Sequence, residues 1–260
     1  DPARAGSRGD AVRRSRRVRA GERPRPGSRR LPGELADRPS HLTEAEVANR
    51  RMWRVVERTG SVYVRAWTSY LQGLIHLQRC EWSAAAELLE QAVEQRFLHH
   101  ARAALDSMAG LILAYQALGR EGEARIVLQT LNEYVAALDD PAMESVAISI
   151  EARLALLQGR LETARRCLEM TESQPEGALV WWLEILSITR CRTMIDLGSP
   201  GDVVKAEAKL RKFAGIAEAQ HNIYQPTRIK PLLAMACEMQ GKAEEALDIL
   251  ERVVTMAWKG

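Results

Sequence analysis

The sequence predicts an all-α fold: a tandem helix-hairpin solenoid, wound as a right-handed superhelix of about five helix pairs. A short motif recurs five times between residues 62 and 258, at intervals of 39 to 42 residues. In each copy a turn residue is followed five positions later by alanine and nine positions later by leucine. Such a period is typical of stacked helical units, each of which buries its apolar side only against its neighbours.

The three repeated positions are visible directly in the sequence. The turn residues are Cys80, Gly119, Gly159, Gly201 and Gly241. The small residues are Ala85, Ala124, Ala164, Ala206 and Ala246. The leucines are Leu89, Leu128, Leu168, Leu210 and Leu250.

Each residue type suits its position in a helical hairpin. Glycine ends the first helix because it adopts a positive φ without a Cβ clash. Alanine lets the second helix approach the first, and the leucine four residues later lies on the same face and fills the seam. At Cys80 glycine is missing, so we expect the first turn to close with a different geometry.

The hairpins predict eleven helices, with Asp140-Pro141, Gln174-Pro175 and Ser199-Pro200-Gly201 as punctuation between them. The expected helices span residues 44–58, 62–79, 82–98, 101–118, 121–138, 142–158, 161–173, 178–197, 202–220, 225–240 and 243–258. Tyr115, four residues before its turn, matches an aromatic position of the tetratricopeptide (TPR) pattern. The repeat therefore resembles a degenerate TPR, although its period exceeds the usual 34 or so residues.

Residues 1–42 differ from this array, and we expect them to form a disordered Arg/Pro/Gly-rich tail before a solenoid that spans residues 43–260. Residues 1–30 hold eleven arginines and three acidic residues, a net charge of +8, which leaves −5 for the rest of a chain whose total is +3. Such a tail cannot bury enough apolar surface to fold. It is either a basic arm for nucleic acid or an acidic membrane, or a solvated extension, and the lack of interleaved aromatics favours the extension.

The composition also indicates the cellular compartment of the protein and argues against DNA binding, metal binding and catalysis. No apolar run of about 18 residues and no secretory signal is present, and the four cysteines are scattered, which favours a cytoplasmic protein that spans no membrane. The acidic body does not favour direct DNA binding. The histidines lack ligand partners at helical spacing and no catalytic constellation stands out, so we expect no metal, no cofactor and no enzymatic activity.

The inner surface of the solenoid is the expected binding site. In TPR-type stacking, first-helix positions 13, 10, 6, 3 and 2 before the turn face a concave groove, where a protein partner or a small-molecule inducer would bind. The polar and aromatic candidates there are Trp67, Tyr70, Gln78, Asp106, Gln116, Ser149, Arg153, Arg228 and Glu238. An ordinary solvated face is an equal alternative for any one of them. The adjacent Trp181 and Trp182 are a further candidate for surface stacking, although core packing is the commoner role of tryptophan.

Several longer strings resemble one family. The segments 73–96, 108–125, 150–164, 181–192 and 218–254, which include WWLEILSITRCR and EAQHN, resemble the large ATP-dependent LuxR-type transcription regulators of the MalT type. The resemblance covers about residues 43–258. It implies the helical repeat region that receives an inducer or a partner in a multidomain ATPase.

The sequence departs from that family in two ways. It has no G-x-x-x-x-G-K-[ST] phosphate loop, and no recognition helix follows the last repeat. The resemblance therefore implies a fragment without the ATPase and helix-turn-helix domains. The main hypothesis is the effector- or partner-sensing region of such a regulator. The alternative is a stand-alone adaptor for protein–protein interaction, and an enzyme is disfavoured.

Overall fold

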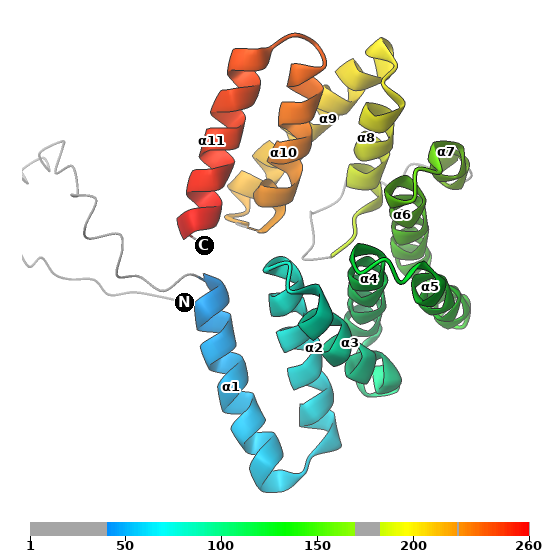
Figure 1. Ribbon diagram of the computed structural model, residues 1–260, viewed down its shortest axis with the longest axis vertical. Helices are drawn as coiled ribbons and strands as arrows, with labels where there is room; N and C mark the ends of the chain where they lie inside the picture. The colour runs from blue at the N-terminus through cyan, green and yellow to red at the C-terminus, as the bar shows by residue number, and fades with distance from the viewer. Residues whose placement is uncertain (1–40, 170–182, 223, 260) are drawn as a thin grey trace, which may run out of the picture. The chain divides into compact units, whose positions relative to one another are not determined.

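The computed structural model describes residues 41–169, 183–222 and 224–259, and within them the chain forms eleven α-helices, one 3-10 turn (η2, Arg96–Leu98) and no strand (Figure 1). The all-α prediction is confirmed. The helices are α1 (His41–Thr59), α2 (Val62–Gln78), α3 (Trp82–Glu94), α4 (Ala101–Ala117), α5 (Glu121–Ala136), α6 (Pro141–Leu157), α7 (Leu161–Glu169), α8 (Leu186–Leu197), α9 (Pro200–Ala219), α10 (Tyr224–Glu238) and α11 (Ala243–Lys259). None of these helices is long and apolar enough to cross a membrane.

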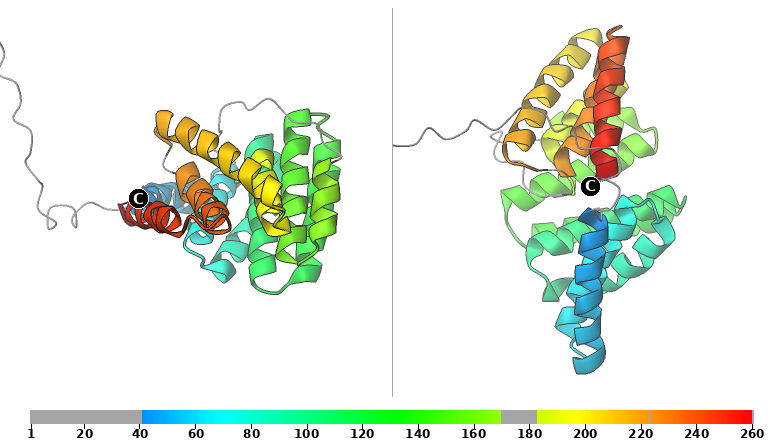
Figure 2. Two further views of the ribbon diagram at one scale, coloured as in Figure 1. Left: turned by 90° about the horizontal axis from the view of Figure 1, so that it is seen from above. Right: turned by 90° about the vertical axis from the view of Figure 1, so that its left-hand side faces the viewer.

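The helices pair into five hairpins that stack in chain order. The hairpins are α2–α3, α4–α5, α6–α7, α8–α9 and α10–α11, and α1 packs on α2 ahead of them. The first helices also contact one another in series, α2 with α4, α4 with α6, α6 with α8 and α8 with α10. Figure 2 shows the hairpins succeeding one another from cyan to red. The helical repeat solenoid therefore has one side built from the first helices.

The hairpin turns share one backbone geometry, and the expected exception at Cys80 is wrong. Cys80 has φ 59°, close to the 70–76° of Gly119, Gly159 and Gly241. In all four turns the next residue donates its backbone N–H to a carbonyl five positions earlier, as Arg120 does to Tyr115 at 2.8 Å. This is the Schellman arrangement, which satisfies carbonyls at a helix end. The cysteine adopts it despite the crowding of its Cβ.

We expect Cys80→Gly to raise the free energy of unfolding by about 1 kcal/mol, because a left-handed backbone costs a residue with a Cβ roughly this amount. Urea denaturation measures the change. Gly119→Ala is the matched control: no atom lies within 4 Å of an added Cβ there, so only the backbone is strained. It should lose a similar amount, and equal stability of all three proteins would contradict the shared geometry.

The fourth turn differs from the prediction. Its left-handed residue is Gly198, with φ 71°, and Gly201 lies inside α9 instead. Pro200 begins α9, where its missing N–H has no cost. The second helices of the other hairpins all begin at the same short distance before their repeated alanine. Helix α9 begins almost one turn further ahead of its alanine, Ala206. Ala206 and Leu210 are nevertheless fully buried, so the seam keeps its register.

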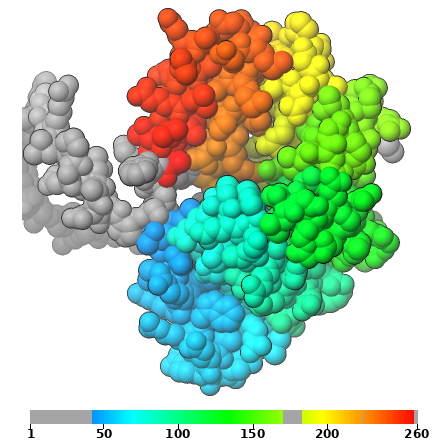
Figure 3. Space-filling model, viewed as in Figure 1, coloured from blue at the N-terminus to red at the C-terminus, as the bar shows by residue number. Residues whose placement is uncertain are grey.

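The repeated alanines and leucines line the seams, with one informative exception. All five alanines are at most 4% exposed, and Leu89, Leu168 and Leu210 are buried with them. Leu250 is 40% exposed and lies on α11 with the exposed Leu247 and Val254. Figure 3 shows α11, in red, at one side of the array. Leu250 occupies the repeated seam position, but no further described hairpin packs against its helix.

Three other boundaries need correction. The helix expected over 178–197 begins only at Leu186, because Leu183–Ile185 is not helical. The helix expected to reach residue 98 ends at Glu94 and is followed by η2. Helix α1 begins at His41, inside the predicted tail. The rest of that tail, residues 1–40, and the candidates Trp181 and Trp182 lie outside the described residues.

Candidate partner-binding site

The side made by the first helices holds a buried carboxylate, Glu184, which is only 1% exposed. Arg153 from α6 pairs with it, and Nη2 of Arg228 from α10 lies 3.2 Å from Oε1. The hydroxyls of Ser149 and Thr189 donate to Oε2 at 3.4 and 3.3 Å. Glu184 belongs to the short stretch before α8, which Figure 1 shows running down from α8 toward α4. Two guanidinium groups and two hydroxyls therefore satisfy one carboxylate.

A second buried carboxylate, Asp106 of α4, lies next to the same stretch. Its Oδ1 accepts the backbone N–H of Leu183 at 3.1 Å, across 77 residues of sequence. Its Oδ2 accepts a hydrogen bond from the Tyr70 hydroxyl of α2 at 3.4 Å and lies 3.9 Å from Nε of Arg102. We call the combined set the Glu184–Asp106 network. Its members are Tyr70, Arg102, Asp106, Ser149, Arg153, Glu184, Thr189 and Arg228.

Repeat register explains why these side chains meet. Asp106 and Arg228 each stand 13 residues before the left-handed turn residue of their hairpin, Tyr70 and Ser149 stand 10 before theirs, and Arg153 stands 6 before its own. Equivalent positions of stacked first helices point to the same side of the array. Five of the nine predicted site residues are thus brought together. They surround a segment of the same chain and are not an open surface.

Burial and charge shape the electrostatics of the network. Burial raises the pKa of Asp106 to about 6, against its N–H and arginine contacts, and raises the pKa of Tyr70 above its usual range. Burial and the charges of Arg192 and Arg228 hold the pKa of Arg153 well below its ordinary value. Burial and Arg228 likewise lower the pKa of Arg192, on α8, to about 10. The arginines repel one another and so favour a negative charge between them, at Glu184, whereas burial disfavours the charge of Asp106.

Asp106 should make the fold more stable at mildly acidic pH. Its folded pKa of about 6 exceeds the unfolded value of 3.8, so the folded state binds the proton more tightly. Stability from this group therefore rises as pH falls through 6 and levels off below 3.8. Between pH 7 and pH 5 the gain is about 1 kcal/mol.

Urea denaturation of the wild type and of Asp106→Asn at both pH values checks this expectation. Asparagine can still accept the Leu183 N–H but does not titrate, so the variant should lose the gain attributable to this position. An equal pH dependence in the two proteins would show that Asp106 is not the titrating group.

The other four predicted residues lie elsewhere. Trp67 packs edge-on against Tyr70 and lies against His99 and His100, with ring centroids 5.0 to 5.9 Å apart. Gln116 accepts a hydrogen bond from Gln158 at 2.8 Å and so links α4 to α6. Gln78 and Glu238 are exposed at the ends of α2 and α10. These residues border the array near its turns or its first seam and do not join the network.

Sequence reasoning missed Leu183, Glu184 and Thr189. The signal was a lone glutamate directly after an apolar stretch, Ala178 to Leu183. A carboxylate carried into an apolar environment needs a partner, so its position already implied buried cations nearby. Which arginines supply them depends on tertiary contacts 31 and 44 residues away.

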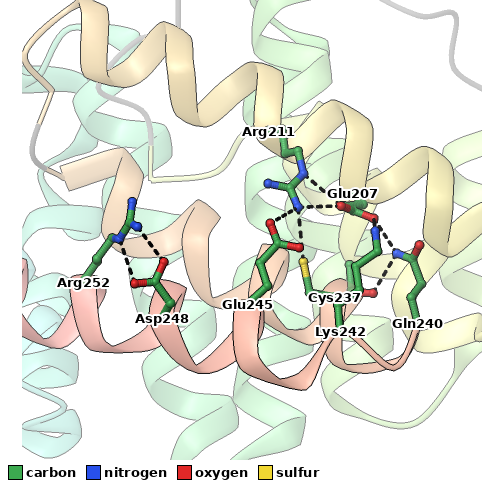
Figure 4. Close-up of polar contacts among 9 residues, drawn as sticks. Glu207, Arg211, Cys237, Gln240, Lys242, Glu245, Asp248 and Arg252 are labelled. Carbon is green, nitrogen blue, oxygen red and sulfur yellow. Dashed lines mark hydrogen bonds and ion pairs between the residues drawn. The ribbon is translucent and has the colours of Figure 1, made fainter.

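A separate cluster at the last two hairpins has potential metal ligands but is an ion-pair clasp. Atoms of Glu207, Cys237 and Glu245 lie within 4.8 Å of one another. Figure 4 shows Arg211 between the two carboxylates, 2.7 Å from each, and Lys242 2.7 Å from Glu207. These cations already neutralise the carboxylates, so the cluster joins α9, α10 and α11 without any need for an ion.

Comparison with known proteins identifies no family for this chain. No family model matches the chain, and no curated protein matches it. Two solved structures are similar, both described as nearly identical TPR-like repeats of a kinesin light chain from Podosopora anserina, one of them in a point-substituted form. Each shares 20% sequence identity, with TM-scores of 0.42 and 0.43, and covers 75% of this chain and 96% of its own.

Proposed function

We propose that this chain is a non-catalytic binding scaffold that holds a polypeptide partner along the side formed by its first helices. Polar side chains from α6, α8 and α10 converge on the carboxylate of Glu184, and Asp106 of α4, itself bonded to Tyr70 of α2, holds the adjacent Leu183 N–H. This arrangement is the observation that carries the proposal. Helical repeat arrays bind along such continuous surfaces. A polypeptide is favoured over a small-molecule inducer because the occupant here is itself a stretch of chain, with Ile185 extended at φ −133° and ψ 115°.

The biological setting that we propose is a cytoplasmic transcription regulator. The resemblance of segments in all five hairpins to LuxR-type, MalT-type proteins supports it, and in such a regulator the array would sense the partner. The alternative is a stand-alone adaptor. The coding sequence on either side of this chain discriminates the two, since a regulator requires a nucleotide-binding domain before the array and a helix-turn-helix after it. Neither domain would be found beside an adaptor.

Site-specific cross-linking tests the scaffold itself. A photo-reactive residue placed at Gln78 or Glu238, at exposed ends of first helices, should capture the same protein in cells. The matched control is Val204 on α9, a second helix, where the side chain is 52% exposed and should capture nothing in common with the other two. Calorimetry with the purified partner then measures the affinity. Identical capture at all three positions, or at Val204 alone, would refute binding along the first helices.

A further inference from the structure

We propose that Leu183–Ile185 is an internal stand-in for the partner, and that the partner binds as an extended segment whose acidic side chain replaces Glu184 between Arg153 and Arg228. This inference rests on the proposed function and specifies its ligand: an apolar residue followed by a glutamate in an extended chain. The geometry of the three residues points to it.

The stretch is held as a bound peptide is held. The backbone N–H of Leu183 donates to a side-chain carboxylate, Asp106, as in the recognition of extended peptides through their main chain. The Leu183 side chain, 8% exposed, belongs to the apolar cluster formed by α2, α3, α4, α5 and α6. Gly110 of α4 lies beside this side chain: a Cβ there would be in ordinary contact with Leu183 Cδ2, at 3.5 Å, and tight against Leu89 Cδ1, at 3.0 Å. An apolar pocket and a main-chain acceptor thus flank the carboxylate site.

The negative charge of Glu184 neutralises only part of the positive charge of the arginines around it. Arg153 and Arg228 contact its carboxylate directly, and Arg192 lies near enough for Arg228 to lower its pKa. Two guanidinium groups on one carboxylate, with Arg192 nearby and offset by Asp196, favour an anionic occupant. A ligand carboxylate in place of Glu184 would restore the same charge-assisted contacts, so the exchange would leave no arginine buried without a partner.

Competition between the internal and the external segment would set the affinity. While Leu183–Ile185 is in place, the site is closed, and the apparent dissociation constant is the intrinsic value divided by the open fraction. Weakening the internal segment should therefore tighten binding of the external one. This is the reverse of the usual effect of a mutation at a binding site.

Fluorescence anisotropy with the full chain tests this reversal. The probe is the labelled peptide Ser-Gly-Leu-Glu-Ile-Gly-Ser, and its control has glutamine at the acidic position. We expect Glu184→Gln to bind the acidic probe at least about tenfold more tightly than the wild type does, the equivalent of about 1.4 kcal/mol. Adding Arg228→Gln should abolish the gain, whereas adding Arg252→Gln, which alters an exposed pair on α11, should preserve it.

Each remaining outcome counts against the inference. An unchanged affinity, or an equal gain for the glutamine peptide, overturns it. Competition by N-acetyl-glutamate amide as strong as by the acidic peptide would assign the site to a free carboxylate, and so also overturns it. Should Glu184→Gln not fold, hydrogen exchange of the wild type decides: saturating acidic peptide must accelerate exchange of the Leu183 amide, and no acceleration refutes displacement. Cross-linking from Gln78 and Glu238 would succeed even then, so the two proposals fail separately.

Discussion

Replacing Ala164 with tryptophan is expected to lower the free energy of unfolding by about 3 kcal/mol, because the substitution forces a large ring into a close-packed seam. Ala164 of α7 is fully buried and belongs to a cluster with Ala152, Ala155, Leu168 and Leu186. The alanines on α6 place its backbone close to Ala164, so a tryptophan ring there would have to displace the helix or the buried Leu168 and Leu186. Urea denaturation at neutral pH measures the loss.

The control for that substitution is Ala208→Trp. Ala208 lies on α9 with its side chain exposed, so the same ring meets solvent and not a seam. Its free energy of unfolding should change by less than about 0.5 kcal/mol, as is usual for surface positions. Equal melting of the Ala164 variant and the wild type would show that the five-residue interval from turn to alanine does not mark the helix contact.

Loss of Glu207 is expected to have an effect of similar size. Burial opposes its ionisation, but hydrogen bonds from Lys242, Arg211 and Gln240 outweigh burial and bring its pKa from 4.5 to about 2. That difference corresponds to about 3 kcal/mol of stability at neutral pH. Because the folded pKa is the lower one, this stability is complete above pH 4.5 and disappears as the pH falls toward 2. Glu207→Ala should therefore lose about 3 kcal/mol at pH 7.

The variant and the wild type should converge in stability as the pH approaches 2. Asp248→Ala provides the matched control, since it removes the carboxylate of an ion pair on α11 whose two side chains are 69% and 54% exposed. Exposed pairs of this kind contribute about 0 to 1 kcal/mol. If Glu207→Ala were no more destabilising than Asp248→Ala, the clasp would not hold α9, α10 and α11 together.

The features predictable from the sequence were those that depend on a short local pattern and recur in several repeats. The alanines and leucines of the seams follow from their interval to a turn, and each recurs in several copies. The turn at Gly198 was misplaced because the Gly-Ser-Pro-Gly run offers two glycines, and only the extra length of α9 decides between them. At Cys80 the residue type suggested an irregular turn. The backbone nevertheless adopts the left-handed geometry and the hydrogen bond that the turns of the other hairpins have.

The binding site was predictable only in part, for a different reason. Asp106, Ser149, Arg153 and Arg228 occupy repeat positions, so register alone assigns them to one side of the array. Leu183–Ile185 follows no repeat, and its apolar residues fit a helix as well as a strand. Its conformation is fixed by Asp106 and by arginines of two other hairpins, and no local pattern encodes those contacts.

The bond between Asp106 and Leu183 joins the second hairpin to the fourth and skips the third. Tyr224 of the fifth hairpin packs on the apolar cluster that the first three hairpins share with Leu183. An array held only by adjacent units can fray from either end, one unit at a time. Ties of this kind bind distant units into a single cooperative block, so the middle and the end of the chain gain or lose their structure together.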